Sequence, residues 1–405
     1  MEQVLYSLPD GWEWHSVKKL SHNIQYGHTA KAESNGNAKF LRITDIQDGK
    51  IDWQGVPTVS LEEKEINKYA LNDDDLIFAR SGATAGKSIL IKNAPKGAVF
   101  ASYLIRIVPN KKDIIPEYLS YFFLTPAYWE VVGQNAAGAA QPNINGTKLS
   151  EFIVPVAPQG EQKRIVEKLN ALLTRIDTAI EHLRESITLA DALFKSTLSS
   201  LVCDESKEYE RLSLEELGSF SGGGTPSKSK SEFWNGEILW VTPKDMKSPV
   251  ITDSELKITK EGVSGSSAKF IPPRSLLIVA RSGILRHTLP VCINETECTV
   301  NQDIKVFIPS ERITSEYTQH MLKGYESFIL SELVKGGVTV ESLKYKDFQN
   351  FKFPVPSAEQ QKRIVGELSK INQLANPVKT ELVDKIEDLK NLKASILDSA
   401  FKGEL

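Results

Sequence analysis

Apolar side chains recur at alternating steps of four and three residues in two long segments of the chain. The first segment covers residues 160–202, and its repeated positions are Ile165, Leu169, Leu172, Ile176, Ala179, Leu183, Ile187, Ala190, Phe194 and Thr197. The second opens at Ser357 and keeps the same register at Ile364, Leu368, Ile371, Ala375, Val378, Leu382, Ile386, Leu389 and Ile396. This heptad pattern predicts two long amphipathic helices that pack on each other, most simply antiparallel.

The second helix carries its own start and stop signals. Gln360 follows Ser357 by three residues, as in a capping box, and Gly403 stands where a C-cap is expected. Pro377 lies inside the pattern and removes a backbone hydrogen bond, so we expect a kink near Asn376. A helix of about 40 residues is roughly 60 Å long, which is the length of about 18 base pairs of DNA.

A short motif opens both helices and marks a duplication. Pro155-Val156 precedes Gln162-Lys163-Arg164-Ile165-Val166, and Pro354-Val355 precedes Gln361-Lys362-Arg363-Ile364-Val365 with the same spacing. A period this long indicates a duplicated module and not a solenoid repeat. We therefore predict α/β domains at 1–155 and 204–354, a central spacer helix at 156–203 and a C-terminal spacer helix at 355–405.

The two domains are expected to be mixed α/β and homologous. In the first, β-branched and aromatic runs predict strands at 40–43, 75–80, 88–91 and 103–108. Helices are predicted near 17–24 and at 116–124, and the polar run 134–143 is predicted as a loop. In the second domain, the run from Ile278 to Gly283 matches the run from Ile77 to Gly82.

Composition narrows the class of protein. The net charge of the 405 residues is −3, the pI is about 6.2, and acids and bases nearly balance, which argues against non-specific nucleic-acid binding by the whole surface. The three cysteines are scattered without metal-ligand spacing, and no apolar run reaches the length of a membrane span. We expect a cytoplasmic protein without a secretory signal.

Several motifs together resemble those of specificity subunits of Type I restriction–modification systems. They are Leu8-Pro9-Asp10-Gly11-Trp12, the two copies of Gln-Lys-Arg-Ile-Val, Gly222-Gly223-Gly224-Thr225-Pro226 with the segment from Leu239 to Met246, and the C-terminal segment from Leu392 to Phe401. The second half departs from the pattern because it lacks the Leu-Pro-x-Gly-Trp opening and has the segment from Arg211 to Gly218 in its place.

The resemblance implies a division of labour. Two target-recognition domains would each read one half of a bipartite site in double-stranded DNA, and the two helices would set the spacer and dock two methyltransferase subunits. Restriction subunits would join this core. The chain itself would be non-catalytic and hold no cofactor, with S-adenosylmethionine, ATP and Mg used by the partner subunits.

The candidate DNA-binding residues lie in glycine-bounded loops, at strand ends and in amide-containing turns. Backbone can approach a partner closely at glycine, Thr, Ser and Lys can bind phosphates, Arg can read guanine, and Asn or Gln can read adenine. The candidates are Tyr26, Thr29, Lys31, Arg80, Ser81, Lys87, Gln141, Asn143, Gly223, Thr225, Lys228, Thr242, Lys244, Arg281, Ser282 and Arg286. The alternatives stay open: flexible surface loops, a simple turn around Pro142, and arginines paired with acids of their own domain.

Other patterns give weaker hypotheses. Lys163, Arg164, Lys362 and Arg363 are candidates for partner docking, because a helix N-terminus does not favour cations, although they could be solvated charges. The run from Ser81 to Ser88 lacks the first glycine of a P-loop and precedes an expected strand, so nucleotide binding is disfavoured. Asp245 with Glu255 and Lys257 faintly resembles a nuclease triad. An enzyme with its own DNA-modifying site and a coiled-coil scaffold without a DNA role are the competing functions.

Overall fold

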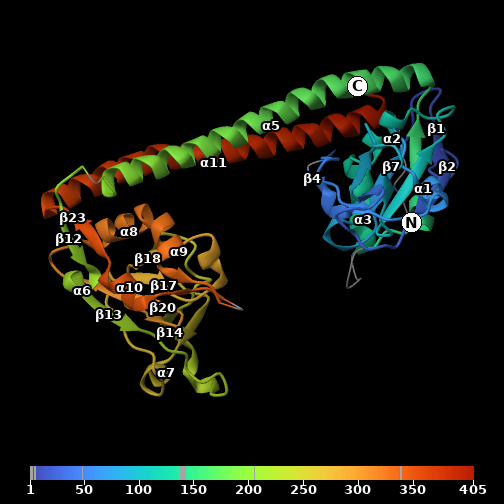
Figure 1. Cartoon of the computed structure of the whole chain (residues 1–405). Coiled ribbons are helices and arrows are strands. Elements are labelled where there is room, and N and C mark those ends of the chain that lie inside the picture. The colour runs from blue at the N-terminus through green and yellow to red at the C-terminus, as the bar shows by residue number, and fades with distance from the viewer. Residues whose placement is uncertain (1–2, 4–5, 48, 137–142, 205, 338–339) are drawn as a thin grey trace. The chain divides into compact units, whose positions relative to one another are not determined.

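The chain divides into two compact units in the computed structural model (Figure 1), which describes all residues except 1–2, 4–5, 48, 137–142, 205 and 338–339. Unit 1 comprises Met1–Leu183 and Val383–Leu405, and unit 2 comprises Arg184–Leu382. Each unit contains one α/β domain and a part of each long helix. The predicted fold class, two homologous mixed α/β domains with two long antiparallel helices, is confirmed.

Unit 1 is built on a four-stranded sheet in the order β2-β10-β7-β8, with a three-stranded sheet, β6-β3-β9, beside it. The strands of these sheets are β2 (Ser21–Tyr26), β10 (Leu104–Pro109), β7 (Leu76–Ala79), β8 (Ser88–Leu90), β6 (Thr58–Val59), β3 (Ala38–Leu41) and β9 (Val99–Phe100). Smaller pairs join β1 (Glu13–Ser16) to β11 (Ile153–Val156) and β4 (Ile46–Gln47) to β5 (Lys50–Ile51). The short helices are α1 (Glu63–Tyr69), α2 (Pro116–Phe122), α3 (Pro126–Ala136) and α4 (Gly146–Glu151), with 3-10 turns η1 (Ile43–Asp45) and η2 (Gly82–Thr84).

Unit 2 repeats this plan. Its main sheet has the order β13-β20-β17-β18-β15, and β16-β14-β19 lies beside it. These strands are β13 (Gly218–Gly222), β20 (Ile304–Pro309), β17 (Leu276–Val279), β18 (Val291–Asn294), β15 (Val250–Ile251), β16 (Leu256–Ile258), β14 (Trp234–Val241) and β19 (Thr299–Val300). The remaining pairs are β12 (Glu210–Ser213) with β23 (Lys352–Val355), and β21 (Val334–Lys335) with β22 (Ser342–Leu343). The short helices are α6 (Leu214–Leu217), α7 (Lys260–Ser264), α8 (Ser315–Gly324), α9 (Glu326–Glu332) and α10 (Tyr345–Asn350), with η3 (Ser231–Phe233) and η4 (Gly283–Arg286).

Two predictions of secondary structure in unit 1 are wrong. The stretch predicted as a helix near Val17–Ile24 is a turn followed by strand β2, because its backbone pairs with β10 in an antiparallel ladder. The predicted loop 134–143 begins inside α3, which ends at Ala136, and residues 137–142 lie outside the described part. The four strands predicted in unit 1 and the helix at Pro116 are confirmed to within a few residues.

The two long helices are α5 (Gln159–Val202) and α11 (Ala358–Lys402), as the heptads predict. They run antiparallel in each unit: Lys393 binds Asp177 at 2.7 Å in unit 1, and Lys379 pairs with Asp191 in unit 2. The seam is packed at Ile165, Leu169 and Ile386. The capping box is present, since Ser357 N–H donates to Gln360 Oε1 at 3.0 Å, and Gly403 has the positive φ of a C-cap.

One seam position departs from the prediction. Val378 is 52% exposed and does not pack, although the heptad pattern places it inside. It follows Pro377, through which α11 continues without a break in its helical assignment. The seam is therefore interrupted beside this proline, and the predicted kink near Asn376 stays a prediction.

A buried glutamine joins each α/β domain to its helix. Gln162 is 1% exposed, accepts from Ile115 N–H at 2.8 Å and donates to the carbonyl of Ala157 at 2.8 Å. In unit 2, Gln361 accepts from Thr314 N–H at 3.0 Å and donates to the carbonyls of Arg312 and Pro356 at 2.9 and 3.0 Å. The repeated motif therefore begins with a hydrogen-bonded joint, which the spacing alone did not reveal.

Candidate DNA interface

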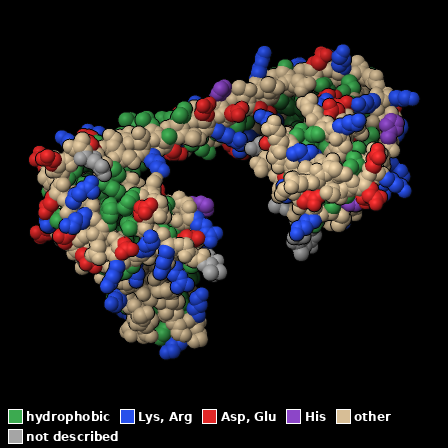
Figure 2. Space-filling view, in the orientation of Figure 1, with side chains coloured by type: hydrophobic (Ala, Val, Ile, Leu, Met, Phe, Trp, Pro, Cys, Tyr) green, Lys and Arg blue, Asp and Glu red, His purple; other side chains and the backbone are tan. Residues whose placement is uncertain are grey.

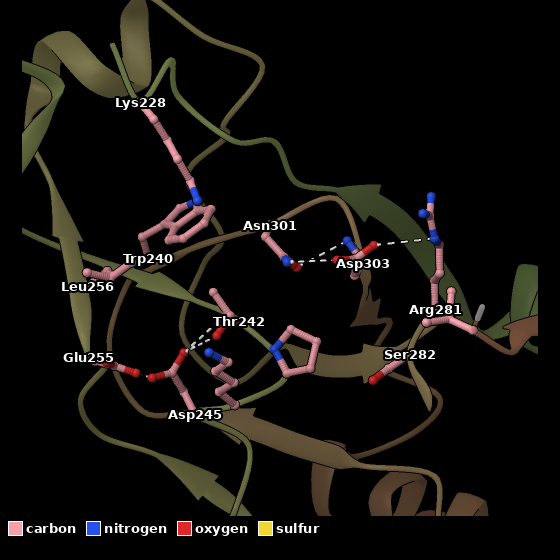
Figure 3. A pocket seen from close by; sticks show the side chains of 13 residues that line it. Lys228, Trp240, Thr242, Asp245, Glu255, Leu256, Arg281, Ser282, Asn301 and Asp303 are labelled. Atoms are coloured by element: carbon pink, nitrogen blue, oxygen red, sulfur yellow. Dashed lines mark hydrogen bonds and ion pairs between the residues drawn. The ribbon is translucent and has the colours of Figure 1, made fainter. Parts of the chain in front are cut away.

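A hollow of about 460 Å³ in unit 2 collects residues from six separate segments (Figure 3). Five of the sequence candidates line it: Lys228, Thr242, Lys244, Arg281 and Ser282. Trp240, Asp245, Asn301 and Asp303 complete most of its wall, and the side chains of Lys228 and Arg281 stand on opposite sides of it in Figure 3. Motifs that are far apart in the sequence thus form one surface that is rich in hydrogen-bonding groups.

Asp245 holds the turn that follows β14. Its Oδ2 accepts from Thr242 N–H at 2.7 Å and from Thr242 Oγ1 at 2.8 Å, and its Oδ1 accepts from Glu255 N–H at 2.9 Å. Lys257 pairs with Asp253 instead, at 3.0 Å. Asp245 therefore stabilises the turn, and no group of three His, Cys, Asp or Glu in the described residues could hold a metal ion.

The glycines of the Gly222–Pro226 segment pack against their own domain. A Cβ on Gly223 would lie 1.9 Å from the carbonyl oxygen of Val300, and one on Gly224 would lie 2.0 Å from Ser267 Oγ. Trp240 Nε1 donates to the carbonyl of Gly224 at 2.9 Å, and Thr225 donates to Gln302 Oε1 at 2.5 Å. The close backbone approach that we expected at Gly223 is thus made inside unit 2.

The two candidate arginines of unit 2, Arg281 and Arg286, have different partners. Arg281 Nε lies 3.9 Å from Asp303 Oδ1, too far for a hydrogen bond, and the Arg281 side chain is 66% exposed. Arg286 Nε donates to Glu341 Oε1 at 2.5 Å, and this hydrogen bond lowers the pKa of Glu341. The alternative of an arginine paired inside its own domain therefore describes Arg286 better than Arg281.

In unit 1 the candidates form a looser group. The guanidinium of Arg80 lies 5.2 Å from the centre of the Tyr26 ring, and Tyr26 Oη accepts from Gly146 N–H at 2.7 Å. Ser81 forms an isolated β-bridge with the exposed Asn143. Strand β8 follows this loop where a P-loop would continue as a helix. The remaining described candidates, Thr29, Lys31 and Lys87, are exposed, and Gln141 lies outside the described residues.

The strand pairings correct one equivalence between the units. Ala79 pairs with Leu104 in unit 1, and Val279 pairs with Ile304 in unit 2, so the strands match with an offset of 200 residues. The sequence match between Arg80 and Arg281 has an offset of 201. Arg80 consequently corresponds to Ala280, and Ser81 corresponds to Arg281. The isolated β-bridges agree with this match, because Ser81 pairs with Asn143 and Arg281 pairs with Ser342. Because neighbouring strand residues point to opposite faces, the two arginines do not occupy equivalent places.

The same offset reveals a residue that the sequence reading missed. Phe40 and Leu41 pair with Val99 and Phe100, as Trp240 and Val241 pair with Thr299 and Val300. Arg42 therefore takes the place of Thr242. It binds Asp45 through Nε at 3.1 Å and through Nη2 at 2.8 Å. The matching Asp45 and Asp245, four residues after Leu41 and Val241, were the signal in the sequence.

The candidate docking residues lie at the helix starts. Lys163, Arg164, Lys362 and Arg363 are all exposed. Arg164 lies 3.4 Å from Glu161, and Arg363 lies 3.7 Å from Glu367, so these two are parts of local ion pairs along their helices. Exposed ion pairs contribute little to stability, which leaves these side chains accessible to a partner.

The long helices also expose apolar residues that the sequence reading missed. Leu193 on α5 is 67% exposed and Leu374 on α11 is 75% exposed, both in unit 2. Leu189 and Val378, the latter a predicted seam position, are also exposed, and we call these four residues the apolar stripe. Figure 2 shows hydrophobic side chains along this part of the helices. Among the described residues, no helix has the length and apolar character that crossing a membrane requires.

Comparison with known proteins identifies the family. The family model described as Type I restriction modification DNA specificity domain matches residues 9–189 and again 206–388. The specificity subunit of the Type I restriction enzyme EcoR124I/EcoR124II of Escherichia coli is 38% identical over 57% of this chain and 56% of its own length, so the aligned region spans little more than half of that relative.

Two further similarities cover nearly the whole chain. The putative Type I restriction enzyme MjaX specificity subunit of Methanocaldococcus jannaschii is 23% identical over 98% of this chain and 94% of its own length. A solved chain from work on the complex assembly and conformational transition of the type I R-M system matches 99% of this chain and 100% of its own length, with a TM-score of 0.75 and 20% identity, and so shares the fold. The chain belongs to the family of Type I restriction modification DNA specificity domain proteins.

Proposed function

We propose that this chain is the DNA-recognition subunit of a Type I restriction–modification complex, and that each α/β domain reads one half of a bipartite site. The observation that carries the proposal is the hollow of unit 2, where Lys228, Thr242, Lys244, Arg281 and Ser282 converge. Unit 1 has the same scaffold with different side chains at the matching positions, such as Arg42 in place of Thr242. One fold with two different surfaces suits two different half-sites.

The chemistry of the candidates fits contacts with DNA. Lys228 and Lys244 can bind phosphates, and Arg281, held by no hydrogen-bonded acid, can donate to guanine O6 and N7. In unit 1, Thr29, Lys31 and Lys87 are exposed for phosphate contacts, while Asn143 can read adenine. A net charge of −3 implies that partner subunits supply part of the electrostatic attraction to DNA.

The partners in this proposal are two methyltransferase subunits, which restriction subunits join. The apolar stripe and the exposed cations at Lys163, Arg164, Lys362 and Arg363 give the helices both apolar and charged groups for docking. The chain itself performs no chemistry: S-adenosylmethionine, ATP and Mg serve the partner subunits. The complex works in the cytoplasm, where it meets DNA.

The test is a gel shift with the full chain, with and without its methyltransferase subunits, at several salt concentrations. The DNA target is first found by mapping methylated adenines in cells that carry the whole operon. We expect the target-bearing duplex to bind at least about 10³-fold more tightly than random duplex, as sequence-specific proteins do. Equal binding of both duplexes in all conditions would favour a scaffold role, and methylation by the chain alone would favour an enzyme.

A further inference from the structure

Tyr103 and Asp303 occupy the same position in the two units. Tyr103 directly precedes Leu104, which pairs with Ala79 in unit 1. Asp303 directly precedes Ile304, which pairs with Val279 in unit 2. The carbonyl of Tyr103 accepts from Arg80 N–H at 3.0 Å, and the carbonyl of Asp303 accepts from Ala280 N–H at 2.8 Å. The backbone is therefore equivalent at this point, and only the side chain changes.

In unit 2 this position presents a hydrogen-bond acceptor. Asp303 lines the hollow, and its Oδ2 accepts from Asn301 Nδ2 at 3.2 Å, while Asn301 Oδ1 accepts from Asp303 N–H at 3.1 Å. Asn301 lies beside Asp303 in Figure 3 and orients its carboxylate. Arg281 stands 3.9 Å from the other oxygen, so a strong donor and a strong acceptor lie side by side at one edge.

In unit 1 the same position presents an aromatic ring. Tyr103 is 65% exposed, so most of its ring and its hydroxyl are accessible to a partner. The residue that matches Asn301 is Ala101, since Ala101 N–H donates to the carbonyl of Leu41 and Asn301 N–H donates to the carbonyl of Val241. Alanine supplies no side-chain group to orient an acid here. Unit 1 therefore offers an apolar face and a hydroxyl where unit 2 offers a charged acceptor.

These two surfaces suit different base edges. A carboxylate accepts from the N4 amino group of cytosine, and a neighbouring arginine donates to guanine, so Asp303 with Arg281 suits a cytosine or guanine. The ring of Tyr103 makes an apolar contact with the methyl group of thymine, and its neutral hydroxyl does not supply the negative charge of a carboxylate. We propose that Tyr103 and Asp303 are specificity-determining residues, which make the two half-sites differ at one corresponding position. This inference rests on the proposed function.

The experiment is selection from a randomised double-stranded DNA library by the full chain bound to its methyltransferase subunits. The parent chain, Asp303→Asn and Tyr103→Ala are compared, and the selected half-sites are sequenced. Asp303→Asn keeps the shape of the side chain but replaces one acceptor oxygen by a donor group. Tyr103→Ala removes a largely exposed ring, so its effect on folding is small, and circular dichroism verifies the fold of both variants.

We expect Asp303→Asn to change the base preference at one or two positions of one half-site, by about tenfold or more, and Tyr103→Ala to do so in the other half-site. Each variant has an internal control, because its second half-site must stay unchanged. Unchanged half-sites in both folded variants, or changes in the same half-site, would overturn the inference while leaving the proposed function intact. If the parent chain selects no bipartite site at all, the proposed function itself fails.

Discussion

Replacing Gln361 by alanine tests whether the joint between the α/β domain of unit 2 and helix α11 depends on the buried amide. The amide makes three hydrogen bonds, one from Thr314 N–H and two to the carbonyls of Arg312 and Pro356, and the residue is 1% exposed. Alanine would leave a buried N–H and two carbonyls without this partner. A buried unpaired polar group costs about 1–3 kcal/mol, because the desolvation penalty is no longer compensated.

We therefore expect Gln361→Ala to lower the free energy of unfolding by about 3 kcal/mol. For a unit of about 200 residues this corresponds to a fall in Tm of roughly 6–12 °C. Urea unfolding followed by tryptophan fluorescence measures the free energy. Hydrogen exchange of the amide of Thr314 gives a local readout, and we expect this amide to exchange faster in the variant.

Lys362→Ala is the matched control, since its exposed side chain is adjacent in the same motif. Surface substitutions of this kind usually change stability by less than about 0.5 kcal/mol. If Gln361→Ala stays within 0.5 kcal/mol of Lys362→Ala and Thr314 keeps its protection, the reasoning about the buried joint is refuted. Gln162→Ala repeats the test in unit 1, where Ile115 N–H loses the corresponding acceptor.

Three further predictions concern packing, docking and pH. Gly223→Ala should destabilise unit 2 by about 1–3 kcal/mol, because its Cβ would lie 1.9 Å from the carbonyl oxygen of Val300. Gly222→Ala is the control, since its Cβ would lie 3.7 Å from Lys305 Nζ, and its Tm in a thermal melt should stay near that of the parent. Leu193→Ser with Leu374→Ser should leave Tm unchanged and weaken binding of the methyltransferase subunits at least about tenfold in calorimetry, and unaltered binding would remove the apolar stripe from the docking proposal. Burial raises the pKa of Glu326, but hydrogen bonds from Lys323, Thr288 and the N–H of Leu289 outweigh it, so that the pKa lies below its ordinary value of 4.5. The stability this provides is present above about pH 4.5 and is lost as the pH falls through the lowered pKa. Glu326→Gln should therefore be less stable than the parent at pH 7, and urea titrations should show the difference narrowing below pH 4.5; a constant difference would contradict the assignment.

The sequence by itself determined the duplication and the two helices. Heptads act locally: Ile165, Leu169 and Ile176 lie on one face of any helix that the segment forms, so a seam follows wherever a partner helix is present. Capping at Ser357 and the C-cap at Gly403 are equally local. The family also followed from the ordered set of short motifs, although each motif alone is weak.

Tertiary structure decided which residues share a surface. Lys228, Thr242, Lys244 and Arg281 lie on three separate segments, and only the folding of β14, β17 and β19 around the hollow brings them together. The buried glutamines depended on tertiary structure too, because their partners Ile115 and Thr314 lie 47 residues away in the sequence.

The equivalence of the two units shows the limit of sequence most clearly. The shared letters Ala-Arg-Ser-Gly match Arg80 to Arg281, but hydrogen bonding in the ladder matches Arg80 to Ala280. Side chains alternate between the faces of a strand, so a shift of one residue exchanges the faces while the sequence identity stays the same. The sequence by itself thus determined that the chain has two related domains and two long helices. Only the pairing of strands decided that Tyr103 corresponds to Asp303, because register is a property of hydrogen bonds between segments and not of either segment alone.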